Sequence, residues 1–245
     1  MLPAFLEGEG LGTAYEYYTK YNVLKDSILA RRVDRLLIAG LPEKYGYSMD
    51  FTGYAIHSNA ELTIMDERPY KIAKHKLITE KLFGKEAFDK VKYVYVKSWL
   101  KPPHTSFHDI ALSCEVFQRF SEKEKEIYVA FLCDSANCVA IFVPNAANKA
   151  HSTISKLRTV SLNELTRHFQ PRFRIDRRGY LDMPPSPPGR YATSSHQDTL
   201  KRRLSCQILE AWYWLIESTA SNAIPVKRFY HLVYNIGERV NSVQI

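Results

Sequence analysis

One stretch near the N-terminus constrains the fold more than any other part of the sequence. A short apolar run, Leu36 to Ala39, is followed at once by a glycine-bearing turn, Gly40 to Gly46. A continuous apolar run of this length is typical of a strand buried on both faces of a parallel sheet. A second run, Leu62 to Met65, ends in Asp66, which lies 26 residues beyond Gly40. The pattern predicts strand, turn, crossover helix and second parallel strand.

The turn between these strands has features of a nucleotide-binding site. Glycines let backbone N–H groups and the start of a helix approach a ligand closely. An acid at the tip of the next strand can accept hydrogen bonds from ribose hydroxyls, and the spacing to Asp66 is near the roughly 20 residues expected for that role. Only Gly40 and Gly46 are glycines here, so a purely structural turn is the alternative.

The rest of the chain alternates apolar runs with helical patterns. Further strands are expected at Val91 to Val96, Ile110 to Leu112, Cys138 to Val143 and Phe229 to Tyr234. Helices are expected at Ala14 to Asp34, Ser48 to Ser58, Tyr70 to Phe83, Phe117 to Phe131, Ser161 to Phe169 and Ser195 to Ser218. The charged run Ser121 to Glu126 is expected to be an exposed turn. Alternating strands and helices predict a doubly wound α/β fold with a mostly parallel sheet.

Length and composition predict a single domain and no membrane span. The 245 residues suit one α/β domain, with an N-terminal helical segment (1–35), a cofactor-binding core (36–170) and an elaboration (171–245) that holds a proline-rich loop. No apolar run reaches the roughly 18 residues of a membrane helix, and Glu7 and Glu9 replace a basic leader. We expect a cytoplasmic protein. Four cysteines without a C-x-x-C pair indicate reduced thiols and no metal site.

Positive charge is concentrated in the C-terminal third. Of the net charge of +8, the segment from Lys156 to Arg203 contributes +7, with eleven Lys and Arg against four Asp and Glu. Localised positive charge attracts anionic partners, so this segment predicts an acidic substrate, a membrane surface or RNA. A solvated basic face is the alternative.

Four segments together resemble the ordered landmarks of class I S-adenosylmethionine-dependent methyltransferases. They are residues 36–47, 61–69, 109–120, and 139–145 with His151. The resemblance covers about residues 30 to 170 and implies a Rossmann-like sheet of about seven strands with S-adenosyl-L-methionine at the carboxyl ends of the first strands. It implies that the methionine moiety is held by Ala39, Gly40, Leu41, Pro42, Glu43 and Gly46. It assigns the ribose to Asp66 and Glu67, and the sulfonium to Ser113, Cys114 and Glu115.

The chain departs from the family pattern at two positions. Ile38 stands where an acid usually precedes the first glycine, and Pro42 stands where the family has a second glycine. These departures favour an alternative, a catalytically inactive Rossmann-like partner or regulatory protein. An RNA-binding or RNA-modifying protein is a third hypothesis, which rests on the basic segment.

Methyl transfer needs mainly an aligned acceptor, because the sulfonium already activates the methyl group. We expect a small or anionic acceptor. His151 follows the fifth expected strand and is the candidate general base, since a neutral imidazole takes up a proton near pH 7. Candidates for contact with the acceptor are Asn145, Tyr180, Asp182 and Arg190. Packing, capping or turn formation is the alternative role for each.

Overall fold

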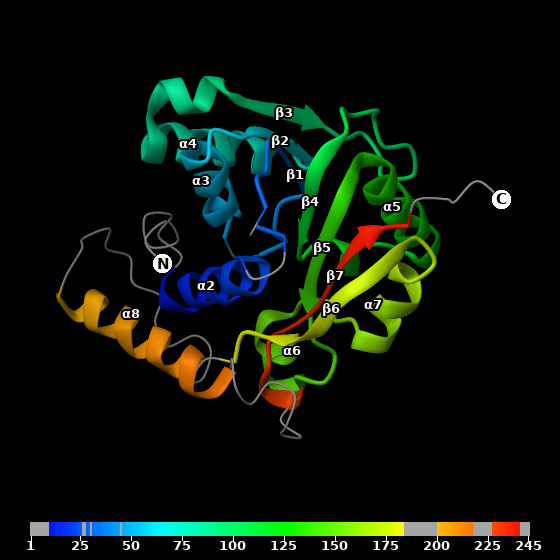
Figure 1. Ribbon diagram of the computed structural model, residues 1–245. Helices are drawn as coiled ribbons and strands as arrows, with labels where there is room; N and C mark the ends of the chain where they lie inside the picture. The colour runs from blue at the N-terminus through cyan, green and yellow to red at the C-terminus, as the bar shows by residue number, and fades with distance from the viewer. Residues whose placement is uncertain are drawn as a thin grey trace.

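A seven-stranded sheet forms the centre of the protein (Figure 1). The computed structural model describes residues 10–25, 28–29, 31–44, 46–183, 200–217 and 227–240. The strands lie in the order β3-β2-β1-β4-β5-β7-β6, and β7 runs antiparallel to β5 and β6. Their bounds are β1 Arg35–Ala39, β2 Glu61–Asp66, β3 Val91–Tyr95, β4 His108–Cys114, β5 Ala136–Pro144, β6 Phe173–Leu181 and β7 Leu232–Arg239. The predicted fold class is confirmed.

Helices cover both faces of this sheet, with α3 and α4 on one side and α5 and α7 on the other (Figure 1). The helices are α2 Leu11–Lys25, α3 Met49–His57, α4 Pro69–Asp89, α5 Glu122–Ser135, α6 Lys149–Ser155, α7 Leu162–Phe169 and α8 Leu200–Trp212. Short 3-10 turns lie at Phe117–Arg119 and Lys227–Phe229, and α8 continues into a π-helical turn, Tyr213–Glu217. No helix in the described ranges is long and apolar enough to cross a membrane.

Strand β1 explains why the sequence signal is so clear. Leu36, Leu37, Ile38 and Ala39 are all at most 1% exposed. Successive side chains point to opposite faces, so Leu37 and Ala39 pack into the core beneath α5 and α7, and Leu36 and Ile38 into the core beneath α3. Burial on both faces requires a continuous apolar run, which is what the sequence has.

Two helix predictions were wrong in their bounds. The first helix ends at Lys25 and does not continue to Asp34. Ser121 to Glu126 is not an exposed turn but the start of α5, where the Ser121 side chain accepts from the N–H of Glu124 and the Glu124 carboxylate accepts from the N–H of Ser121 at 2.8 Å. This capping box satisfies two otherwise unpaired donors. The dense charges hid the helical pattern.

The arginine-rich segment forms a strand that the sequence analysis did not predict. Strand β6 contains Arg174, Arg177 and Arg178, and it is the last strand of the sheet, so one edge and much of one face stay exposed. Charged side chains on an edge strand interrupt the alternation of apolar and polar residues by which a strand is identified in a sequence. The final strand begins at Leu232 and not at Phe229. The proline-rich loop from 184 onward and residues 195–199 of the expected long helix lie outside the described residues.

Candidate ligand site at the carboxyl edge of the sheet

The turn after β1 and the end of β2 are joined directly. The Gly40 N–H donates to the Met65 carbonyl and the Leu41 N–H donates to Asp66 Oδ2, both at 2.7 Å. Gly40 has a φ of +91°, and a Cβ there would lie 2.7 Å from Val116 Cγ2, so only glycine fits. The sequence-predicted pair Gly40 and Asp66 is therefore brought together. The strand order reverses between β1 and β4 at this point, which is where open α/β sheets bind ligands.

Arg68 forms hydrogen bonds and an ion pair with the carboxylate of Asp66. Asp66 is fully buried, and its Oδ1 accepts from the N–H and Nε of Arg68, both at 2.8 Å. Arg68 Nη2 donates to Asp66 Oδ2 at 2.8 Å and to the Leu41 carbonyl at 2.6 Å. Sequence reasoning missed Arg68, because nothing in the pattern distinguishes it from a surface arginine. In this arrangement the oxygens assigned to a ribose bind the protein's own donors.

Glu67 anchors a second arginine beside the turn. Its carboxylate accepts from Trp99 Nε1 at 2.8 Å and forms an ion pair with Arg119 Nη1 at 3.2 Å. The side chains of Arg68 and Arg119 stay 16% and 12% exposed. Two partly accessible guanidinium groups beside one turn suit a ligand carboxylate or phosphate.

The end of β4 lies against the same turn. The Tyr128 hydroxyl donates to the Ala39 carbonyl and lies 2.8 Å from Ser113 Oγ, which ties β4 to β1. Burial raises the pKa of the Cys114 thiol to about 12, so it stays protonated. Glu115 is 2% exposed and has a positive φ of 53°. A charged residue held in this strained conformation at a strand end is typical of a functional site.

Helix α2 brings further charged residues to this edge. Lys20 is fully buried, and its Nζ lies 2.7 Å from Glu16 Oε1. Burial alone lowers the pKa of Lys20, but Glu16, with Cys114 and Asp50, outweighs this effect and the net shift is upward. The Tyr17 hydroxyl accepts from the N–H groups of Tyr47 and Ser48 at the start of α3.

Several of these buried polar atoms have no partner. Burial raises the pKa of Asp50 to about 7, against the opposing effects of the Lys20 charge and of the backbone N–H groups of Phe51 and Asp50 in the first turn of α3. Burial followed by repulsion from Glu16 raises the pKa of Glu115 to about 8. Among the residues that the structure describes, the buried side-chain atoms without a hydrogen-bond partner here are Ser48 Oγ, both Asp50 carboxylate oxygens, Glu115 Oε2, Gln118 Oε1 and Arg119 Nη1. Most buried side-chain polar atoms in native proteins are hydrogen-bonded, so this cluster is a candidate ligand site.

His151 lies in a histidine pair. Its ring stacks on His231 with centroids 4.2 Å apart, and His231 Nδ1 lies 3.0 Å from Asp182 Oδ2. Burial, with repulsion from His231, lowers the pKa of His151 to about 4, so the ring is neutral near pH 7. Its Nδ1 has no partner within the described parts of the chain. The structure thus joins two predicted residues, His151 and Asp182, through one that the sequence analysis missed.

The other predicted acceptor contacts have structural partners or lie outside the described residues. Asn145 Nδ2 donates to the carbonyls of Lys227 and Tyr230 at 2.7 and 2.9 Å, and its Oδ1 accepts from the Ala147 N–H. Tyr180 is half-buried beneath Lys227. Arg190 is not among the described residues. Gly46 is required by Tyr17, whose hydroxyl leaves no room for a Cβ.

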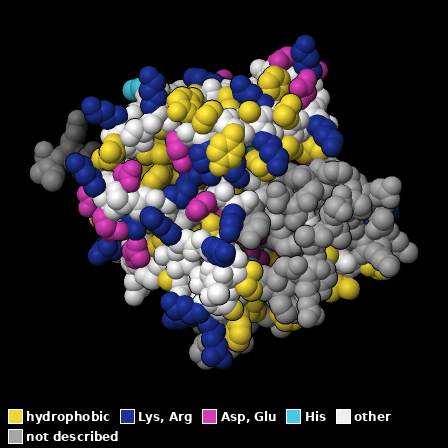
Figure 2. Space-filling view, turned by 180° about the vertical axis from the view of Figure 1, so that it is seen from behind, with side chains coloured by type: hydrophobic (Ala, Val, Ile, Leu, Met, Phe, Trp, Pro, Cys, Tyr) yellow, Lys and Arg dark blue, Asp and Glu magenta, His cyan; other side chains and the backbone are white. Residues whose placement is uncertain are grey.

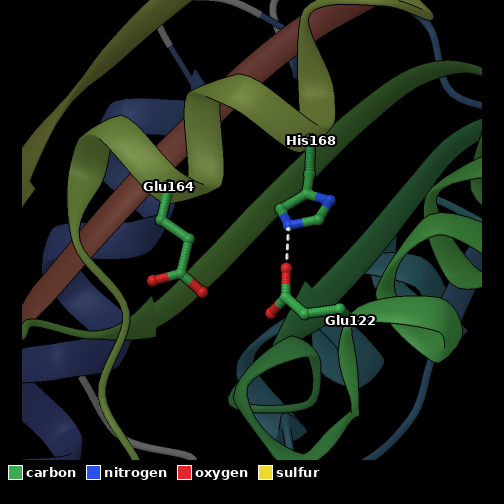
Figure 3. A group of neighbouring side chains, drawn as sticks. All are labelled: Glu122, Glu164 and His168. Carbon is green, nitrogen blue, oxygen red and sulfur yellow. Dashed lines mark hydrogen bonds and ion pairs between the residues drawn. The ribbon is translucent and has the colours of Figure 1, made fainter.

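Away from this edge, Glu122, Glu164 and His168 form a group with spacing suited to a metal ion (Figure 3). Lys125 Nζ lies 2.8 Å from Glu122 and 2.7 Å from Glu164, and His168 bonds Glu122 at 3.2 Å. The ammonium of Lys125 already pairs with both carboxylates, and Arg167 also pairs with Glu122. We interpret the group as an ion-pair network between α5 and α7.

The arginines of β6 are partly engaged by the protein. Arg174 Nη2 pairs with Glu238 at 2.6 Å, and Arg177 Nη1 donates to the Val23 carbonyl at 3.2 Å. On the described part of the face in Figure 2, Lys and Arg side chains are interspersed with acidic and hydrophobic ones and do not gather in one stripe. RNA binding stays a prediction.

Comparison with known proteins supports the fold. No protein-family model matches the sequence, and no curated protein matches it. The structure resembles the methyltransferase domain of bacterial-CtHen1-CN with a TM-score of 0.59 and 10% identity over 93% of this chain and 100% of that one. It also resembles the N-methyltransferase NodS from Bradyrhizobium japonicum WM9, with a TM-score of 0.55 and 9% identity over 93% and 98% of the two chains.

A third similar structure is the [4+2]-cyclase SpnF, with a TM-score of 0.54 and 12% identity over 89% of this chain and 80% of that one. The protein therefore has the fold of class I S-adenosylmethionine-dependent methyltransferases, as the sequence resemblance predicted. At these identities the likeness is one of fold.

Proposed function

We propose that the protein is an S-adenosylmethionine-dependent methyltransferase that acts on a small acceptor. The cluster of buried polar atoms without partners at the start of α3 and just after β4 carries the proposal. It lies where the strand order reverses, beside a glycine turn that excludes any Cβ. Solved structures with this fold include methyltransferases, and one of them, NodS, was determined with S-adenosylhomocysteine.

The proposed donor site is formed by the first turn and the acids that follow it. S-Adenosylmethionine, when bound, supplies a sulfonium-activated methyl group. Asp66 would take the ribose hydroxyls once Arg68 releases its carboxylate, and the partly exposed Arg119 would take a ligand carboxylate. His151 is neutral and its Nδ1 has no partner in the described structure, so it can accept a hydrogen bond from a methyl acceptor, but a pKa lowered to about 4 makes it a weak base.

Calorimetric titration tests the donor site. We expect S-adenosylmethionine and S-adenosylhomocysteine to bind at micromolar concentrations and NAD to show no binding. Arg68→Ala should tighten binding because it frees the Asp66 carboxylate. While Arg68 holds that carboxylate, only a fraction of the protein is competent to bind, and the apparent affinity is reduced by that fraction. Arg35→Ala is the matched control, because Arg35 is half exposed and pairs with an exposed Glu61 on the other edge of the sheet. Absence of binding to wild type and to Arg68→Ala would overturn the proposal.

A second function is favoured by one observation. Both oxygens of Asp66 accept hydrogen bonds from Leu41 and Arg68, and the Val116 side chain crowds Gly40. A turn closed in this way suits a Rossmann-like protein that has lost methyl transfer and acts as a partner or regulatory subunit. Failure of Arg68→Ala to bind either methionine compound would support this function.

A further inference from the structure

Most of the unpartnered atoms of the buried cluster are hydrogen-bond acceptors. They are Asp50 Oδ1 and Oδ2, Glu115 Oε2 and Gln118 Oε1, and Ser48 Oγ both accepts and donates. The one pure donor beside them, Arg119 Nη1, forms an ion pair with Glu67. Gln118 is 3% exposed, and its Nε2 donates to Glu43 at 3.1 Å, which directs its free oxygen elsewhere. Within the described residues the cluster therefore has more unpaired acceptors than unpaired donors.

The charges around the cluster show the same excess. Glu16 and Lys20 face it from α2, Asp50 from α3, and Cys114 and Glu115 from β4. Glu43, Asp182 and His231 act on it from the turn after β1, the end of β6 and the start of β7. Lys20 is the one buried ammonium among these acids. An unpaired buried carboxylate is costly, so added positive charge would stabilise the site.

A metal ion does not fit this arrangement. A divalent cation needs several oxygen ligands converging within about 2.0–2.6 Å of one point. The Glu122, Glu164 and His168 group is the one set in the described structure whose ligand atoms all lie within 4.8 Å of one another. Among the described residues no group of three ligands that includes Asp50 or Glu115 meets this limit, and acceptors without a common centre suit a ligand that carries several N–H donors.

We propose that this cluster binds the ammonium group of a small amine, and that the methyl acceptor is accordingly an amine. The assignment of an amine as methyl acceptor rests on the proposed methyl transfer, whereas the ammonium site does not. Bound ammonium first gives one proton to the Glu115 carboxylate. The freed nitrogen lone pair then forms the N–C bond to the donor methyl, while the C–S bond breaks and its electron pair stays on sulfur. A carboxyl group that titrates near neutral pH is suited to this proton transfer.

Calorimetry on the full chain without donor tests the ammonium site directly. The probes are 2-phenylethylamine, its neutral analogue 2-phenylethanol and the anion 3-phenylpropanoate at pH 8. We expect the amine to bind at least tenfold more tightly than either analogue. Its affinity should rise from pH 6 to pH 8, because Asp50 and Glu115 ionise over that range while the amine stays charged. Equal binding of the three probes would overturn the proposal.

Substitutions locate the site. Glu115→Gln and Asp50→Asn should each weaken amine binding at least tenfold, and Glu115→Gln should flatten its pH dependence. Glu126→Gln and Asp134→Asn are the matched controls on the exposed face of α5. If the cluster variants do not fold, probe selectivity and the pH profile of the wild type still decide. Unchanged affinity in folded variants would refute the assignment.

Competition experiments show whether the cluster binds the ammonium group of the donor or that of an amine acceptor. Saturating S-adenosylhomocysteine and methylthioadenosine, which lacks the amino-acid part, should both leave amine binding intact. Loss of amine binding with S-adenosylhomocysteine alone would assign the cluster to the donor and overturn the acceptor assignment. Amine binding without any S-adenosylmethionine binding would support the ammonium site while refuting the proposed function.

Discussion

Replacement of Asp66 by Asn is expected to destabilise the protein strongly. The Asp66 side chain is fully buried and binds the N–H of Leu41 and three donors of Arg68. Asn keeps the shape but removes the charge and turns one acceptor into a donor that faces other donors. Breaking a buried ion pair by removing one partner costs about 3–5 kcal/mol. Because 16% of Arg68 remains exposed and partly solvated, we expect the lower end, about 3 kcal/mol.

The assay is urea unfolding followed by far-ultraviolet circular dichroism, with a thermal scan beside it. For a chain of this size about 3 kcal/mol corresponds to a fall in Tm of about 6–12 °C. Asp34→Asn makes the same chemical change in an exposed pair, where Asp34 and Arg32 are 64% and 88% exposed. That control should lose about 0–1 kcal/mol. Equal losses in the two variants would refute the conclusion that the Asp66 pair is a buried structural element.

Three further predictions concern other elements. Gly40→Ala should cost about 1–3 kcal/mol in urea unfolding because of its positive φ and the Val116 contact, whereas Gly12→Ala, with open space around it, should not destabilise; similar losses would contradict this. Burial lowers the pKa of His75 to about 3, so stability should fall as pH drops from 6.5 toward 3, and His75→Gln should flatten that fall; an unchanged pH profile would disprove it. Ser121→Ala should lose about 1 kcal/mol from the α5 cap, measured by thermal unfolding; no loss would argue against the capping box.

Local sequence patterns were sufficient for most of the fold. Strands β1, β2, β4 and β5 are apolar because they are covered on both faces, and this leaves continuous runs that the sequence displays. Strand β6 was not predicted because it lies at the edge of the sheet and carries exposed arginines in place of an apolar run. The start of α5 was not predicted because its charged residues, which include the capping residue Glu124, resemble those of an exposed loop.

The site was predictable only in part. Gly40, Asp66 and Glu115 follow strand ends, and strand ends of a parallel sheet meet at one edge, so their grouping follows from the chain order. The roles assigned to them in donor binding stay predictions. Arg68 was missed because its partner Asp66 lies two residues away but is buried, and the sequence does not reveal burial of a charged pair.

The sequence by itself determined the doubly wound sheet, its glycine turn and the acid that ends β2, because these depend on local burial and backbone freedom. Only the tertiary structure decided which polar residues lie inside. Polar and apolar residues alternate around α2, so nothing in its pattern shows that Glu16 and Lys20 face Asp50 and Glu115 across the sheet edge. Buried charge is a property of packing between distant elements, and that packing creates the acceptor-rich cluster on which the proposed chemistry depends.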